Sequence, residues 1–229
     1  MQIRPATAAD APALAAIYGP EVLHGTASFE TEAPDAAEMA ARLARVQSHG
    51  WPWLVAEVDG AVLGYAYASQ FRDRPAYAHT AENSVYVAAS ARGRGIGLAL
   101  LEALFTAAKA AGFEQMIAVV GDAAGNTASL ALHTRAGFRP VGRLEGVGCK
   151  FGQLLDVAYL QRSLCAAYSA SSRSGSSRTP DQVMPQCRCG PVTRPVAPID
   201  PMASPALSTC PSRTSMRERC RNAETRPKP

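Results

Sequence analysis

A glycine-rich segment, Arg-Gly-Arg-Gly-Ile-Gly at residues 92–97, stands between a β-prone run at 83–87 and an apolar helical run. A turn at a helix entrance directs unpaired backbone N–H groups and the positive end of the helix dipole at one point. An anion binds there, and glycine lets the backbone approach it closely. The segment therefore predicts a phosphate-binding loop. The backbone N–H groups of residues 94–98 would donate hydrogen bonds to the phosphate, and Arg92 or Arg94 would add positive charge.

The spacing of the glycines excludes two common phosphate-binding motifs. A Walker P-loop requires a lysine followed by serine or threonine, and neither stands at that place after Gly97. A dinucleotide fingerprint requires Gly-x-Gly-x-x-Gly, but the sixth position of a frame opened at Gly93 is Leu98. The pattern that remains is Arg92-x-x-Gly95-x-Gly97. Its alternative explanation is a helix start whose small residues allow close packing.

This pattern resembles the pyrophosphate loop of the GCN5-related N-acetyltransferases (GNAT), and the resemblance extends over nearly the whole of residues 1–163. Its nearest branch acetylates phosphinothricin and methionine sulfone. The matching segments keep a consistent order and lie at 17–18, 26–29, 53–57, 64–67, 82–87, 92–97, 115–118, 126–129, 132–133, 137–138 and 147–152. Many separated matches in one order are hard to reach by chance.

The resemblance implies a fold, a reaction and a co-substrate. The fold would be the three-layer α/β acyl-CoA N-acyltransferase fold, a mixed central sheet with helices on both faces. The chain would be an enzyme that moves the acetyl group of acetyl-CoA directly to the α-amino group of a small amino acid or analogue. Phosphinothricin, methionine sulfone and methionine sulfoximine are the implied acceptors, and acetylation of the first confers herbicide resistance. No metal is implied.

The resemblance also implies where acetyl-CoA would bind. Its pantetheine arm would pair like a strand with the β-prone run, its pyrophosphate would occupy the glycine loop, and the helix after 126 would hold the lower part of the arm. The implied contacts are Val85, Tyr86, Val87, Arg92, Gly93, Arg94, Gly95, Ile96, Gly97, Leu98, Asn126 and Ser129.

Two side chains are candidates for moving protons. An acceptor that arrives as an ammonium must lose a proton before it attacks, and the resemblance implies that Glu82 is the base. The alternative is an exposed carboxylate at a strand entrance. His133 stands where many members of the superfamily carry a tyrosine that protonates the leaving thiolate, and an imidazole pKa of about 6.5 permits that role. The alternative is a structural helix histidine.

Charged residues elsewhere are candidates for binding the acceptor. Guanidinium groups of the segment Arg72-Asp73-Arg74 suit the carboxylate and the phosphinyl or sulfone oxygens of an amino-acid analogue, unless the segment is a solvated loop. Glu82 and Asn83 would face the same site, and Lys150 would close the pocket from the late strands or from a second subunit. His24, His49 and His79 lack metal-like spacing.

Three rival functions remain open. The same chemistry on a peptide N-terminus is the nearest of them. Acetylation of a polyamine would favour an acidic pocket, against which Arg72 and Arg74 argue. A non-catalytic acetyl-CoA-binding sensor would need only the glycine loop, whereas the chain also keeps Glu82 and His133.

Composition divides the chain after residue 163. Residues 1–163 carry 13 Lys and Arg against 15 Asp and Glu, whereas 164–229 carry 10 against 4, so the basic balance belongs to the second part. That part, rich in Pro, Ser and Arg, predicts a disordered tail and resembles a read-through or frameshift extension. Cys149 is the single cysteine of 1–163, which favours a reducing compartment.

These observations predict a cytoplasmic protein with no membrane segment and no specific nucleic-acid partner, and the resemblance implies a homodimer. The expected strands lie at 2–4, 53–58, 62–67, 83–88 and 116–120, with two more after 138, and the expected helices at 10–22, 35–50, 96–111 and 127–136. Asp10 should cap the first helix and Pro20 should kink or break it. The dipeptide Asp59-Gly60 suits a tight hairpin.

Overall fold

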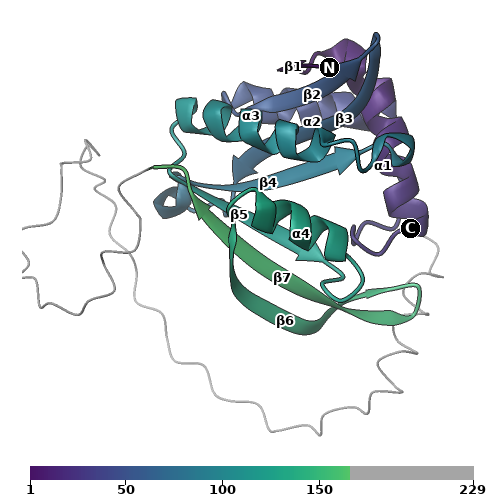
Figure 1. The fold of residues 1–229 in the computed structure, drawn as a ribbon, viewed down its shortest axis with the longest axis vertical. Coiled ribbons are helices and arrows are strands. Elements are labelled where there is room, and N and C mark those ends of the chain that lie inside the picture. The colour runs from purple at the N-terminus through teal and green to yellow at the C-terminus, as the bar shows by residue number, and fades with distance from the viewer. Residues whose placement is uncertain (166–229) are drawn as a thin grey trace, which may run out of the picture.

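The computed structural model describes residues 1–165 of the chain, which form a seven-stranded mixed sheet with helices on both faces (Figure 1). This confirms the predicted three-layer α/β class. The spatial order of the strands is β1-β2-β3-β4-β5-β7-β6. Their bounds are β1 Gln2–Pro5, β2 Trp53–Val58, β3 Ala61–Gln70, β4 Thr80–Val87, β5 Gln115–Gly121, β6 Arg139–Lys150 and β7 Gln153–Ser163. Beyond residue 165, the predicted tail lies outside the described residues.

Two helices cover each face of the sheet. Helices α1 and α2 lie on one face, and α3 and α4 lie together on the other, toward the viewer in Figure 1. The helices are α1 Ala11–His24, α2 Ala36–Ser48, α3 Ile96–Ala110 and α4 Thr127–Arg135, and short 3-10 turns occupy Ala8–Asp10, Pro75–Tyr77 and Ala89–Ala91.

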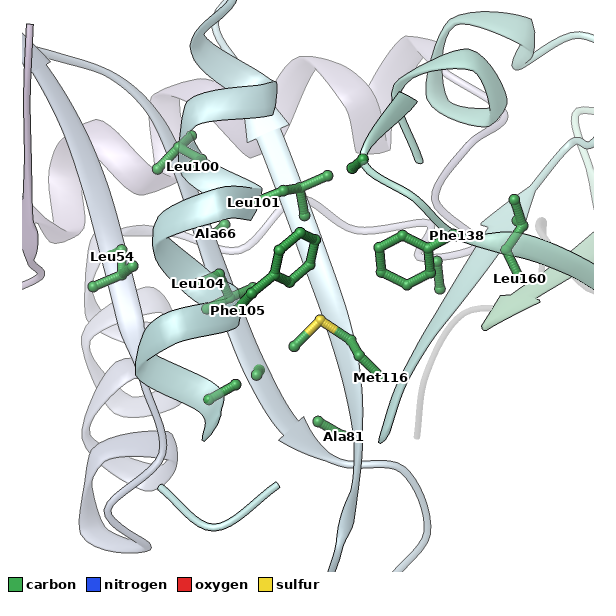
Figure 2. Close-up of a cluster of buried hydrophobic side chains, with 14 of the residues drawn as sticks. Leu54, Ala66, Ala81, Leu100, Leu101, Leu104, Phe105, Met116, Phe138 and Leu160 are labelled. Atoms are coloured by element: carbon green, nitrogen blue, oxygen red, sulfur yellow. The ribbon is translucent and has the colours of Figure 1, made fainter. Parts of the chain in front are cut away.

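The larger core lies between α3 and the sheet. Leu100, Leu101 and Leu104 are fully buried there, and Phe105 points toward Phe138 (Figure 2). The ring centroids of Phe105 and Phe138 are 5.8 Å apart, so the start of β6 packs against α3. The apolar stripe at helical spacing, which the sequence predicts for this segment, therefore faces the sheet as expected.

Strands β4 and β5 run parallel, and their pairing stops early. The paired positions extend only from Thr80 and Gln115 to Asn83 and Ala118, although both strands continue. Beyond Asn83 the side chains of β4 still alternate between the two faces. Val85 and Val87 pack on the α3 side, whereas Tyr86 packs on the α1 and α2 side. The sheet is therefore open between these two strands at their carboxyl ends.

At α1, the chain shows no break at Pro20, and Asp10 takes the expected cap position without a side-chain hydrogen bond to the helix. Pro20 lies inside the helix, which runs without interruption to His24. Buried residues on both sides of Pro20, Tyr18 and Val22 among them, hold the helix on the sheet and offset the one hydrogen bond that proline removes. Asp10 occupies the cap position, but its carboxylate accepts hydrogen bonds from the Arg4 guanidinium and the Thr7 N–H.

The predicted hairpin turn is confirmed. Asp59 and Gly60 connect β2 to β3 with φ angles of 51° and 80°. Two successive residues with positive φ give the turn the twist of the flanking strands.

Candidate active site

A cavity of about 850 Å³ occupies the opening between β4 and β5. Its walls come from both faces of the sheet, because α1 contributes Tyr18 and α4 contributes Leu132 and His133. One end, which we call the loop end, is formed by residues 92–98. The other, the carboxylate end, is formed by Tyr18, Ser28, Glu30 and Glu82.

The loop end has the backbone geometry of an anion site. Gly93 and Gly95 have φ angles of 76° and 80°, a region that favours glycine, and Gly95 is the N-cap of α3. The first-turn N–H groups of a helix have no acceptor within it, so those of α3 are directed at the cavity. A Cβ atom on Gly97 would lie 3.1 Å from Leu132, so a glycine here lets α3 and α4 pack closely.

The predicted contacts of this loop are almost all brought together. Gly93, Gly95, Ile96, Gly97 and Leu98 line the cavity. The Arg92 side chain also lines it and forms an ion pair with Glu21 of α1. The exposed Arg94 is absent from the lining, so its side chain lies apart from this wall.

The predicted pantetheine contacts line the middle of the cavity. Val85, Tyr86 and Val87 come from the part of β4 that is no longer paired with β5. Asn126 and Ser129 come from the start of α4. The Asn126 side chain caps this helix, because its carboxamide oxygen accepts a hydrogen bond of 3.3 Å from the Ser129 N–H. That oxygen therefore stabilises the start of α4.

Glu82 lies within β4 rather than before it, is half-buried, and lines the carboxylate end. Burial raises the pKa of its carboxyl above the ordinary value, and the positive charge of Arg72 opposes this shift. A carboxyl whose pKa is raised toward neutrality is suited to general base catalysis.

His133 is 3% exposed, and both of its ring nitrogens are engaged. Nδ1 lies 2.8 Å from the backbone oxygen of Ser129, to which it donates. Nε2 lies 3.0 Å from the Asn83 amide nitrogen, from which it accepts. Burial lowers the pKa of the imidazole. The prediction that His133 protonates a thiolate stays a prediction, and this geometry describes a neutral ring that holds Asn83.

The predicted acceptor-binding segment Arg72-Asp73-Arg74 lies outside the cavity lining and is exposed. It belongs to the connection between β3 and β4, where the Gln70 amide donates to the Arg74 backbone oxygen at 3.1 Å. Arg72 lies over the Phe71 ring, and its charge acts on Glu82. The segment is therefore beside the carboxylate end, not within it.

Lys150 is 1% exposed and is also absent from the cavity lining. Its ammonium donates to the backbone oxygens of Val22 and Ser28 at 2.7 and 2.8 Å. Lys150 therefore holds the segment after α1, which carries Ser28 into the carboxylate end.

Sequence reasoning missed the polar network of the carboxylate end. The Tyr18 hydroxyl lies 2.7 Å from the Ser28 hydroxyl and 2.9 Å from a Glu30 carboxylate oxygen. Arg42 of α2 pairs with Glu30 through two hydrogen bonds. The available signal was the tyrosine itself, because a tyrosine that packs against a sheet requires a polar partner for its hydroxyl.

No three His, Cys, Asp or Glu side chains among residues 1–165 gather as ligands of a metal ion would. Within the same residues, no helix is long and apolar enough to span a lipid bilayer.

Comparison with known proteins agrees with this geometry. The phosphinothricin N-acetyltransferase of Alcaligenes faecalis is 51% identical over 69% of this chain and 79% of its own length. The L-methionine sulfoximine/L-methionine sulfone acetyltransferase of Pseudomonas paraeruginosa is 40% identical over 73% and 97%. A phosphinothricin acetyltransferase structure from Sinorhizobium meliloti, in complex with AcCoA, superposes with a TM-score of 0.68 at 45% identity, covering 71% of this chain and 87% of that one.

The family model that matches the chain is the acetyltransferase (GNAT) family, over residues 20–138. The match contains the loop end, Glu82 and His133. The chain belongs to the GNAT family of acetyltransferases.

Proposed function

We propose that this protein acetylates the α-amino group of a small anionic amino-acid analogue, with acetyl-CoA as the donor. Phosphinothricin, methionine sulfone and methionine sulfoximine are the proposed acceptors, because relatives at 51% and 40% identity carry these activities in their names. Residues of the loop end would bind the pyrophosphate of the donor through backbone N–H groups.

One observation carries the proposal. A single cavity joins an anion-binding helix entrance to a half-buried carboxyl with a raised pKa, through the opening between β4 and β5. An extended donor anchored at residues 92–98 would bring its thioester toward Glu82. A simple acetyl-CoA-binding protein would need only the first of these parts.

The reaction follows from this placement. Glu82, as a carboxylate, accepts a proton from the ammonium of the acceptor. The freed nitrogen lone pair then attacks the thioester carbonyl carbon, the C–N bond forms, and the C–S bond breaks with its electron pair on sulfur. The nitrogen, which is positively charged after the attack, loses its second proton, and the sulfur takes up a proton, so the products are the neutral amide and coenzyme A as its free thiol. Binding both substrates in one cavity makes this step effectively unimolecular. Because the acceptor nitrogen reaches the carbonyl directly, no covalent acetyl-enzyme is required.

Binding of the acceptor carboxylate is proposed for Arg72 and Arg74. They are exposed guanidinium groups on the segment beside the carboxylate end, and Arg72 already acts on Glu82. A planar guanidinium suits both a carboxylate and a phosphinyl or sulfone group. Asp73 completes the proposed set, with Lys150 supporting it from behind Ser28. Asn83, which the sequence also suggested for the acceptor, lies on the opposite face of β4 from Glu82 and is left out of this set.

Release of coenzyme A, measured by a thiol reagent against a panel of acceptors, tests the proposal. Phosphinothricin, methionine sulfone and methionine sulfoximine should give turnover, with kcat/KM at least about tenfold above that for dipeptides or spermidine. The guanidinium groups of Arg72 and Arg74 favour an acceptor whose carboxylate lies next to the reacting amine, and they repel the cationic spermidine. Faster turnover with a dipeptide would favour a peptide N-terminus as acceptor instead. Binding of acetyl-CoA without turnover on any of them would identify a sensor.

Three broader properties belong to the same proposal. We place the protein in the cytoplasm and expect that its expression gives resistance to phosphinothricin. We also propose a homodimer, because the edge strand β6 exposes the apolar side chains of Val141, Leu144 and Val147. Light scattering of the purified protein would test the dimer, since a monomer at micromolar concentration contradicts it.

A further inference from the structure

Asn83 is a buried polar residue for which the reaction above has no specific use. It is 5% exposed, lines the cavity, and occupies the last position at which β4 pairs with β5. Its amide nitrogen donates to His133, whereas no residue of the described chain donates to its Oδ1. A buried carbonyl oxygen without a donor destabilises the fold, so a native structure retains one where something else supplies the donor.

The orientation of this amide is fixed by its neighbour. Nδ1 of His133 is 2.8 Å from a backbone oxygen, which can only accept, so Nδ1 carries the ring proton and Nε2 is the acceptor. The Asn83 group facing Nε2 must therefore be its NH₂, and Oδ1 must point elsewhere. His133 thus holds Oδ1 in one orientation.

The position of Asn83 also selects the face of the sheet. Side chains alternate along β4, so Asn83 shares a face with Val85 and Val87, toward α3 and α4. Glu82 lies on the opposite face, on the side of Tyr18 and Tyr86. A donor anchored at the N-terminus of α3 lies on the Asn83 side, and the acceptor lies on the Glu82 side.

We propose that Oδ1 of Asn83 accepts a hydrogen bond from an amide N–H of the pantetheine arm of acetyl-CoA, and that His133 is a positioning residue for Asn83. The acetyl thioester offers no N–H or O–H of its own, whereas the arm carries two secondary amides, beside one hydroxyl group that both analogues described below retain. The inference rests on the proposed function for its donor, and it assigns His133 a role other than donating a proton to the thiolate.

The first test changes the ligand and leaves the protein intact. Depsi analogues of coenzyme A, in which one or the other pantetheine amide is replaced by an ester, lack one N–H each. Calorimetry on the wild-type chain should show one of the two analogues binding about tenfold more weakly than coenzyme A, which is the usual effect of one hydrogen bond with a buried partner. Equal binding of all three ligands would overturn the proposal.

The second test assigns this loss to Asn83. In the Asn83→Leu variant, that analogue and coenzyme A should bind equally, because the acceptor oxygen is gone. Gln115→Leu is the matched control: it removes an amide from β5 that contacts Gln161 outside the cavity lining, and it should keep the tenfold preference. A preference that survives in Asn83→Leu would contradict the assignment. Should that variant fold poorly, Asn83→Ala answers the same question, because alanine also lacks an acceptor.

The role of His133 has a spectroscopic signature. Nitrogen NMR of labelled histidine should show the Nδ1–H tautomer in the wild-type protein, with the His133 signal assigned from its loss in His133→Gln. Asn83→Asp places a carboxylate beside Nε2, which should raise the pKa of His133. An Nε2–H tautomer in the wild-type protein would overturn the positioning role. These experiments measure ligand binding or the tautomer of a histidine. Their outcome therefore does not depend on whether any acceptor is turned over, and a failure of this proposal can be told from a failure of the proposed function.

Discussion

The loop end of the cavity is made of backbone, whereas the carboxylate end is made of side chains. At the loop end, consecutive residues supply N–H groups and the glycines supply the conformation. At the carboxylate end, Tyr18, Glu30 and Glu82 arrive from separate parts of the chain and act through hydroxyl and carboxyl groups. Substitutions should therefore affect the two ends differently. Backbone strain should weaken donor binding, and charge changes should alter turnover and its pH dependence.

The largest effect should come from removing the base. Glu82→Gln should lower kcat by about 10²-fold or more near neutral pH, because proton removal by a positioned base contributes that much. The affinity for coenzyme A should stay within about twofold, since the loop end is untouched. Steady-state kinetics and calorimetry measure the two quantities. Glu102→Gln, an exposed change on α3, is the control, and an unchanged kcat in Glu82→Gln would remove the assignment.

The same variant should gain stability at neutral pH. The folded state raises the pKa of Glu82, so it favours the protonated carboxyl, and that favourable contribution is lost as the pH rises through the folded pKa. A neutral glutamine avoids this loss. The thermal midpoint of Glu82→Gln should therefore exceed that of the wild type at neutral pH, and the difference should disappear in acid. A lower midpoint at neutral pH would mean that the carboxylate stabilises the fold.

The second-largest effect should come from backbone strain at the loop end. Gly95→Val and Gly60→Val place a branched side chain at the same φ of 80°, each with open space around the new Cβ. Both should lose about 1–3 kcal/mol of unfolding free energy to strain. Only Gly95→Val should weaken coenzyme A binding, by about tenfold or more, because only Gly95 caps the helix that faces the phosphate. Equal affinities in both variants would contradict a phosphate site at this loop.

The third effect concerns the support of the carboxylate end. Lys150→Met leaves the buried carbonyl oxygens of Val22 and Ser28 without this donor, which should cost about 2–3 kcal/mol of unfolding free energy. The KM of the acceptor should rise more than that of acetyl-CoA, since Ser28 lines the carboxylate end. Lys109→Met, on the exposed side of α3, is the control and should change stability by less than about 0.5 kcal/mol. A change confined to the KM of acetyl-CoA would contradict the conclusion that Lys150 supports the carboxylate end.

The same division explains what the sequence could predict. The loop end is contiguous, and the spacing of its glycines indicates the backbone conformation, so the sequence could single out residues 92–98 as one wall of a site. All of them except Arg94 line the cavity, and their binding of a phosphate stays a proposal. The carboxylate end depends on residues far apart in the chain. Tyr18 and Glu30 meet only because α1 packs beside α2 and the loop between them folds back over the cavity. The sequence suggested that Lys150 closes the pocket, because a lysine is usually exposed. Its burial against the loop after α1 depends on tertiary packing, which the sequence pattern does not show.

The smallest effect tests the electrostatics of the carboxylate end. The positive charge of Arg72 lowers the pKa of Glu82, so Arg72→Gln should raise that pKa further. Because the deprotonated carboxylate is the active form, the acid limb of the kcat/KM profile should move to higher pH. The loss at neutral pH should be less than about tenfold, since Arg72 is exposed and solvent screens its charge.

Arg74→Gln is the matched control for this shift, being an exposed guanidinium on the same segment. If both arginines only bind the acceptor, both variants should raise its KM and leave the limb in place. If Arg72 also tunes the base, its variant alone should move the limb, and high salt should move the wild-type limb the same way because it screens the charge of Arg72. An Arg72→Gln limb at the wild-type pH in low salt would show that burial by itself sets the pKa of Glu82.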